Sequence, residues 1–185
     1  MDLSCQYTTK IGGGSPTVRV TELTDIFNRD GLADEAVGRA HRILLRAVRP
    51  ALDLVLMDAI GDSQWPTEVS GELNALRALG IEQRETDRDN PQMGIRLDPR
   101  SDEQFSIALA LAPYSIGVEG YSLGKLIFGA SDIGTSLWAD LSPDQYRALQ
   151  GLVGRGESVD SLFEVRVPKN RWAWAWFRRS RTPEA

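Results

Sequence analysis

The sequence contains almost no cysteine or histidine, the residue types on which many metal centres and nucleophilic sites depend. Its one cysteine, Cys5, excludes a disulfide within the chain and fits a reducing compartment. Cys5 and the one histidine, His41, are together too few for a zinc site with the usual nitrogen and sulfur ligands. We therefore expect no cofactor and no metal centre of that kind.

Long apolar runs are also missing. The amino-terminal residues MDLSCQYTTK carry no basic start followed by an apolar stretch, so they do not read as a signal peptide. The run IALALAP (residues 107–113) is far shorter than the roughly 20 residues of a membrane span. These features predict a cytoplasmic protein without a membrane partner.

Lysine is scarce as well: it supplies three of the 21 basic residues, and arginine supplies the rest. The net charge is −5, but residues 161–185 carry six basic and two acidic side chains, which leaves −9 for residues 1–160. An acidic body disfavours general nucleic-acid binding, because contacts to the phosphate backbone dominate that affinity. The basic carboxyl-terminal segment is the one part of the chain for which nucleic-acid binding stays an alternative.

What is present fits one globular domain with a buried core. The chain has 185 residues, of which 42% are hydrophobic and 25% charged, and these values are ordinary for a soluble domain. We expect this domain to span residues 1–180. The last residues, RTPEA (181–185), are expected to form a flexible tail.

Three helices are expected. The first spans residues 33–60, where apolar residues recur at helical spacing and Pro50 is expected to kink or split the helix. The second spans residues 67–79 and is closed by Gly80. The third begins after Ser142, where the residues SPDQ form the pattern of a capping box, and a glycine at 154 or 156 ends it.

Strands are expected at the beginning, in the middle and at the end of the chain, without regular alternation with helices. This order favours an α+β fold with a largely antiparallel sheet that closes on a carboxyl-terminal hairpin. The expected strands are two around a glycine-rich turn in residues 3–23, a hairpin of residues 81–87 and 93–99, single strands at 103–113, 114–121 and 125–131, and the final hairpin at 161–179.

Residues 120–124 read GYSLG, which resembles the G-x-S-x-G serine motif of the α/β-hydrolases. A serine nucleophile needs a base, and the family order places the histidine after the serine. Here His41 lies 81 residues before Ser122, and no histidine follows. We therefore predict a glycine-rich turn between two strands at this position, and no catalytic residue.

Four other stretches have compositions that occur in sites. The loops NRDG (28–31) and DRDN (87–90) carry oxygen ligands for calcium or magnesium, and IGGGSP (11–16) carries amides for a phosphate. GASDIGTS (129–136) could line a pocket. Each is better explained as a turn or connection, because Asn, Asp and Gly favour turns. His41 is expected at the surface or at the edge of the core.

The stretch RWAWAWFRRS (171–180) is the most unusual in the chain, because Trp172, Trp174 and Trp176 alternate with alanine and are flanked by arginine. Three such side chains bury on the order of 600 Å², which favours burial by a gross ~15 kcal/mol. On a strand they share one face, because side chains alternate with period two. They therefore form either part of the core or a real binding surface.

The length of the preceding turn decides between these readings. An even turn aligns the tryptophans with the apolar side chains of LFEVRV (162–167) and makes them a core wall, which we favour. An odd turn places Glu164 and Arg166 across from them and creates a surface suited to stacking on bases or sugars. The candidate binding residues are Trp172, Trp174, Trp176, Arg171 and Arg178.

Three classes of function remain. The acidic body and the lack of an assembled catalytic set favour a small protein-binding module, such as an inhibitor, an antitoxin or an immunity-type protein. The first alternative is an enzyme or small-ligand binder that uses carboxylates and arginines in a sheet-lined pocket. The second alternative is a binder of single-stranded nucleic acid through the carboxyl-terminal Trp/Arg hairpin. Another protein is the expected partner, and the oligomeric state is left open.

Overall fold

The structure is a computed structural model that describes residues 18–22, 35–60, 65–83, 92–131, 136–154 and 157–166. Over these ranges the fold is α+β, with a largely antiparallel sheet as the sequence predicts and with four α-helices rather than about three. The helices are α1 (Glu35–Val48), α2 (Ser70–Glu82), α3 (Asp102–Leu111) and α4 (Pro143–Val153). The strands are β1 (Val18–Glu22), β2 (Leu54–Met57), β3 (Ile95–Leu97), β4 (Gly117–Ser122), β5 (Lys125–Ser131), β6 (Ser136–Leu141) and β7 (Phe163–Arg166).

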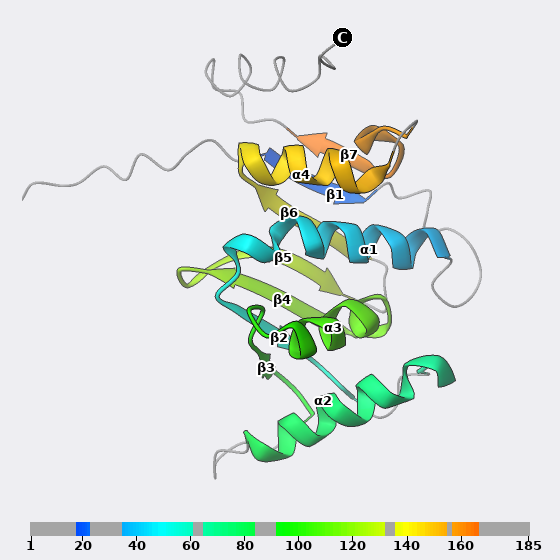
Figure 1. The fold of residues 1–185 in the computed structure, drawn as a ribbon, viewed down its shortest axis with the longest axis vertical. Helices are drawn as coiled ribbons and strands as arrows, with labels where there is room; N and C mark the ends of the chain where they lie inside the picture. Colours follow the sequence, from blue (N-terminus) through cyan, green and yellow to red (C-terminus); the bar gives the residue numbers. More distant parts are fainter. Residues whose placement is uncertain are drawn as a thin grey trace, which may run out of the picture.

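The seven strands form one sheet in the order β3-β2-β4-β5-β6-β1-β7, and every pair is antiparallel. The meander β4-β5-β6 occupies the middle of the sheet. β1 lies between β6 and β7, so the first described strand is held by two strands that come late in the chain (Figure 1).

The helices pack on one face of the sheet (Figure 1). Buried side chains of all four helices join the inward side chains of the strands in one hydrophobic core, centred on residues such as Leu44, Val55 and Phe128. The outward side chains of the strands do not belong to this core. We call that second side the open face.

The first helix is shorter than predicted, and four residues near the end of the predicted range form a strand. α1 ends at Val48, a 3-10 turn follows at Arg49–Ala51, and β2 begins at Leu54. Of the two expected effects of Pro50, a kink or a split, the structure shows the split, since proline removes a backbone donor and crowds the preceding turn. The residues LVLM of β2 then alternate between half-buried and buried, which is the period of a strand.

The predictions for residues 67–99 need two corrections. α2 continues through Gly80 to Glu82, so that glycine is a buried helical residue and not a cap. The predicted hairpin of residues 81–87 and 93–99 is wrong, because residues 81–82 belong to α2 and β3 pairs with β2. A helix end and a strand look alike over so few residues, and the partner of β3 lies far away in the sequence.

The segment at 103–113, predicted as a strand, is the helix α3. The side chain of Ser101 accepts a hydrogen bond from the backbone N–H of Gln104 at 3.3 Å and so begins the helix. Asp102 and Glu103 in the first turn favour the same assignment through the helix dipole. The alanines and leucines that follow are strong helix formers, and they do not alternate with polar residues as a half-buried strand would.

Helix α4 and the strands β4 and β5 confirm the sequence predictions. At the start of α4 the Ser142 side chain accepts from the Gln145 backbone, and the Gln145 side chain accepts from the Ser142 N–H at 2.7 Å. The helix ends at Gly154, whose φ of 105° suits glycine. β7 is the first arm of the predicted carboxyl-terminal hairpin; its second arm and the predicted tail lie outside the described residues.

The outer edge of β3 is closed by a side chain. The Gln83 amide donates to the carbonyl oxygen of Arg96 at 2.7 Å and accepts from the N–H of Arg96 at 2.8 Å. This pair of bonds imitates a neighbouring strand, and it occupies backbone groups that would otherwise be open to strand addition. The residue after α2 thereby fixes the position of β3.

Candidate functional site

Most residues proposed as sites from the sequence fall outside the described part of the chain. This applies to Trp172, Trp174, Trp176, Arg171 and Arg178, and also to the loops at 11–16, 28–31 and 87–90. Of the loop at 129–136, the described residues extend β5 and begin β6, in keeping with a connection between two strands. The roles suggested for these residues remain predictions.

The GYSLG stretch forms the tight turn between β4 and β5, as predicted. Ser122 pairs with Lys125, and the two residues between them both have positive φ, 49° at Leu123 and 74° at Gly124. Two positive values are typical of a type I′ hairpin turn. The Leu123 N–H donates to the Asp53 carboxylate at 2.6 Å, which holds the turn against the residue that precedes β2.

His41 is fully buried on α1, so the prediction of a position at the surface or the core edge is wrong. The reason is that α1 packs against the sheet, α3 and α4 at once, which leaves it a narrow exposed side. Its Nδ1 donates to the Val37 carbonyl oxygen at 2.8 Å, and its buried Nε2 has no partner among the described residues. Burial lowers the pKa of the imidazole to about 4, so the ring is neutral near pH 7. It is bonded within its own helix and does not serve Ser122.

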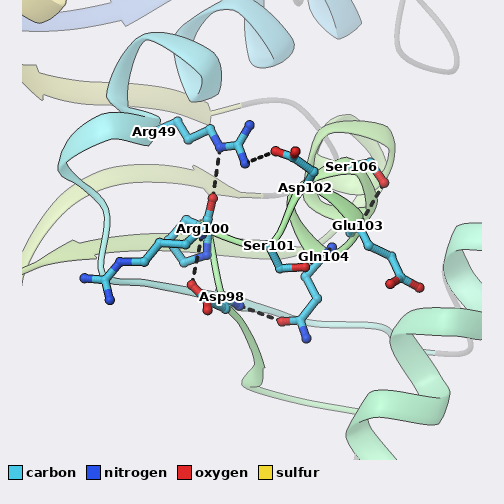
Figure 2. A network of polar contacts seen from close by, with 9 residues as sticks. Arg49, Asp98, Arg100, Ser101, Asp102, Glu103, Gln104 and Ser106 are labelled. Carbon is cyan, nitrogen blue, oxygen red and sulfur yellow. Dashed lines mark hydrogen bonds and ion pairs between the residues drawn. The ribbon is translucent and has the colours of Figure 1, made fainter.

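A cluster of polar groups joins the end of α1 to the start of α3 (Figure 2). The Arg49 guanidinium donates to the Pro99 carbonyl at 2.9 Å and to the Asp102 carboxylate at 2.5 Å, and it stacks on the Phe105 ring at 4.3 Å. Arg49 and Asp102 bind each other, and the Asp98 carboxylate accepts from the backbone N–H of Arg100. These contacts therefore hold the segment after α1 to the start of α3, and they give no support to a carboxylate/arginine active site.

The open face of the sheet is the strongest candidate for a functional surface. An antiparallel sheet with one covered face usually presents polar side chains on the other. Here the central strands instead carry half-buried apolar groups that are not packed against the core: Leu54, Leu56, Tyr121, Leu126 and Trp138. Strand register makes three of them neighbours, since Tyr121 pairs with both Leu54 and Leu126. Leu56 and Trp138 lie at the two ends of an adjacent row, with Glu119 and Gly129 between them. These five residues are called the apolar stripe below.

Trp138 is the largest member of the apolar stripe, and its indole lies over the backbone of Gly129 on the next strand. A Cβ atom added to Gly129 would lie 2.6 Å from the indole Nε1. On the other neighbour of β6, Arg19 places its guanidinium 4.3 Å from the ring centroid and binds the Asp140 carboxylate at 2.8 and 3.1 Å. The ring is therefore fixed in one orientation by a glycine, a cation and an ion pair.

Charges of both signs surround the apolar stripe. The hydrogen bond to Asp140 raises the pKa of Arg19, and the one to Arg166 lowers the pKa of Glu164, so both shifts favour the charged forms of Arg19 and Glu164. The Tyr121 hydroxyl donates to the Glu119 carboxylate at 2.6 Å, and that bond raises the pKa of the phenol. Interspersed charges suit a protein surface better than a polyanion, which prefers a continuous basic groove.

No protein-family model, curated protein or solved structure matches the chain. Within the described residues, no group of three or more histidine, cysteine, aspartate or glutamate side chains could hold a metal ion. None of the described helices is long and apolar enough to span a bilayer.

Sequence reasoning missed the apolar stripe, although some of its signals were present. Residues 54–57 read LVLM, in which the alternate residues are all apolar, so the strand predicts two apolar faces. The long predicted helix across Pro50 hid this pattern. That Trp138 faces outward could not be read from residues 136–141, because the two sides of that strand are set by its neighbours.

Proposed function

We propose that the protein is a non-catalytic binding module that recognises another protein through the open face of its sheet. The observation that carries the proposal is the apolar stripe, which interrupts the polar surface expected on a sheet face that no described helix covers. Contiguous apolar groups rimmed by polar residues are typical of protein interaction sites. The orienting contacts around Trp138 support the same reading, because fixed aromatic side chains are the residues that dominate binding energy in interfaces.

Within this class we favour an inhibitor, antitoxin or immunity-type protein. The support is the small acidic body, with a net charge of −5 over 185 residues, and the mixed charges that border the apolar stripe. Complementary charge accelerates association with a partner of opposite sign. A gene for a toxin next to the gene for this chain would support the assignment. Consistent absence of such a neighbour would remove this narrower reading.

The test compares the same substitution on two sides of the molecule. Glu119→Lys reverses an exposed charge within the open face, beside Leu56 in the strand register. Glu82→Lys reverses an exposed charge at the end of α2, where a cation suits the helix dipole. The full-length chain is used to recover its partner from the native host, and the affinity of each variant for that partner is then measured by calorimetry.

We expect Glu119→Lys to weaken binding at least tenfold, and Glu82→Lys to bind within about twofold of the parent chain. Equal affinities of the two variants would place the contact elsewhere. Recovery of no stoichiometric partner would remove the proposal.

A further inference from the structure

The turn between β4 and β5 contains a leucine that the fold does not explain. Leu123 has a φ of 49°, in the left-handed region that glycine and asparagine adopt more easily than leucine. Its side chain is 94% exposed, so no burial offsets this strain. Both features disfavour leucine at this position on grounds of stability alone.

The turn is also held rigidly. Its Leu123 N–H binds one oxygen of the Asp53 carboxylate at 2.6 Å, and the other oxygen accepts from Arg100 at 3.3 Å. In Figure 1 the β4–β5 hairpin ends in a loop that projects beyond the sheet. The flanking residues of the hairpin, Tyr121 and Leu126, belong to the apolar stripe. An apolar side chain that projects from a fixed backbone is partly pre-organised, because the backbone loses little freedom on binding.

The charges around the tip are arranged with the cations outermost. In the pair of Lys125 and Asp140, the exposed fractions of the side chains are 66% and 14%. In the pair of Arg100 and Asp53, they are 77% and 41%. A partner that approaches the tip therefore meets positive charge around an apolar centre, although the chain as a whole is acidic.

We propose that Leu123 is an anchor residue that a partner protein takes into an apolar pocket with carboxylates on its rim. The inference rests on the proposed function and deepens it by naming the contact and the chemistry of the partner. Strain at an exposed position persists where function requires it. The convex tip requires a concave partner, and the outermost cations require acidic groups beside the pocket.

A lipid bilayer is the other surface that could accept an exposed leucine beside cations, but the magnitudes disfavour it. A single myristoyl chain gives only marginal membrane binding, with an association constant of about 10⁴ M⁻¹. One leucine side chain buries far fewer carbons. In a protein pocket, by contrast, burial of one leucine changes affinity by about 10- to 100-fold and can determine a complex.

The decisive variant is Leu123→Asn, because asparagine tolerates the left-handed conformation and removes the apolar group. It should raise the Tm of the full chain by roughly 2–4 °C and weaken partner binding by about 10- to 100-fold. The matched control is Leu152→Gln, which removes a leucine that is 38% exposed on α4 and should leave affinity within about twofold.

The experiment places the photo-cross-linker p-benzoylphenylalanine at position 123 or at position 152 of the full chain in its native host. The cross-linked protein is identified, and its affinity for the parent chain, for Leu123→Asn and for Leu152→Gln is measured at low and at physiological salt. Cosedimentation with phosphatidylcholine–phosphatidylserine vesicles is measured for the same three chains. Support requires a cross-link at position 123 only, an affinity lost in Leu123→Asn, and weaker binding at the higher salt concentration.

Each other outcome overturns the proposal in a distinct way. A Leu123→Asn chain that binds the partner as tightly as the parent removes the anchor but leaves the binding module, provided that Glu119→Lys still loses affinity. A lower or unchanged Tm removes the premise that leucine strains the turn. Vesicle binding that depends on Leu123 replaces the protein pocket with a lipid surface. If the parent chain has no partner, both proposals fall together.

Discussion

Gly129 shows how one missing side chain positions another. The indole of Trp138 lies where a Cβ atom on Gly129 would be, at 2.6 Å from its Nε1 and 2.8 Å from its Cε2. Gly129→Ala should therefore displace the ring and destabilise the fold by about 1–3 kcal/mol. Gly151→Ala is the matched control, because nothing lies within 4 Å of the added atom in α4, and it should stabilise by about 0.5–1 kcal/mol.

Urea unfolding of the two alanine variants measures this difference directly. Opposite changes in the free energy of unfolding are expected for the same substitution. If Gly129→Ala were as stable as the parent chain, that result would contradict the placement of the indole over the strand. It would equally contradict the fixed orientation of Trp138 on the open face.

His41 makes stability depend on acidity. Its pKa is about 4 in the folded chain, against 6.5 for an exposed imidazole, so the unfolded chain takes up a proton first as the pH falls. The free energy of unfolding that depends on a neutral His41 is fully present above pH 6.5 and is lost between about pH 6.5 and pH 4. The loss is about 3 kcal/mol at the lower end.

The check is urea unfolding of the parent chain and of His41→Leu across that range. Carboxylates titrate in both chains, so the difference between the two curves isolates the histidine. We expect the parent to lose more stability than His41→Leu as the pH falls from 7 to 4. Parallel curves would contradict the assignment of a neutral, buried ring.

At the scale of elements, the edge of β3 is closed by one glutamine. Gln83→Ala removes both hydrogen bonds to the Arg96 backbone and should destabilise by about 1–2 kcal/mol. It also exposes an edge strand, so self-association should increase with concentration. Urea unfolding and light scattering test both effects.

The variant Gln83→Glu refines this test, because it keeps the acceptor for the Arg96 N–H and removes the donor. It should fall between the parent chain and Gln83→Ala in stability. Light-scattering masses that are equal for all three chains would show that the glutamine does not protect the edge.

The elements also show which part of the fold could be read from the sequence. α4 was predictable because its signals are local: Ser142 and Gln145 cap its start and Gly154 ends it. α3 has a similar pattern at Ser101 and Gln104, but the apolar run after it is compatible with a buried strand as well as with a helix. The alternation in β2 was hidden because a pattern on both sides of a proline was read as one helix.

The candidate site was far less predictable than the helices. The apolar stripe combines residues of β2, β4, β5 and β6, and which side of each strand faces outward depends on pairing between distant segments. The positive φ of Leu123 depends on the length of one turn. The tryptophans at 172, 174 and 176 drew attention because their pattern is local, and the surface they would form remains a prediction.

For the whole molecule, the balance of charge predicts weak interaction with nucleic acids. The net charge is −5, and residues 161–185 carry six basic and two acidic side chains. We expect no measurable binding of a single-stranded oligonucleotide by fluorescence anisotropy, even at low salt. Binding that weakens with added salt and disappears in the double variant Arg171→Ala and Arg178→Ala would instead favour the nucleic-acid alternative.

The position of β1 in the sheet delays the completion of folding until late in synthesis. Residues 18–22 pair with 138–141 and with 163–166, so these contacts span more than a hundred residues of chain. At about 5–20 residues per second, the ribosome needs on the order of 10 s to make the stretch that separates β1 from β7. The β4-β5-β6 meander can form during that time, whereas β1 lacks its full set of backbone hydrogen bonds until both neighbouring strands are made.

High contact order of this kind slows folding and prolongs exposure of strand edges. Yield in expression should therefore depend on temperature and chaperone supply during the last part of synthesis.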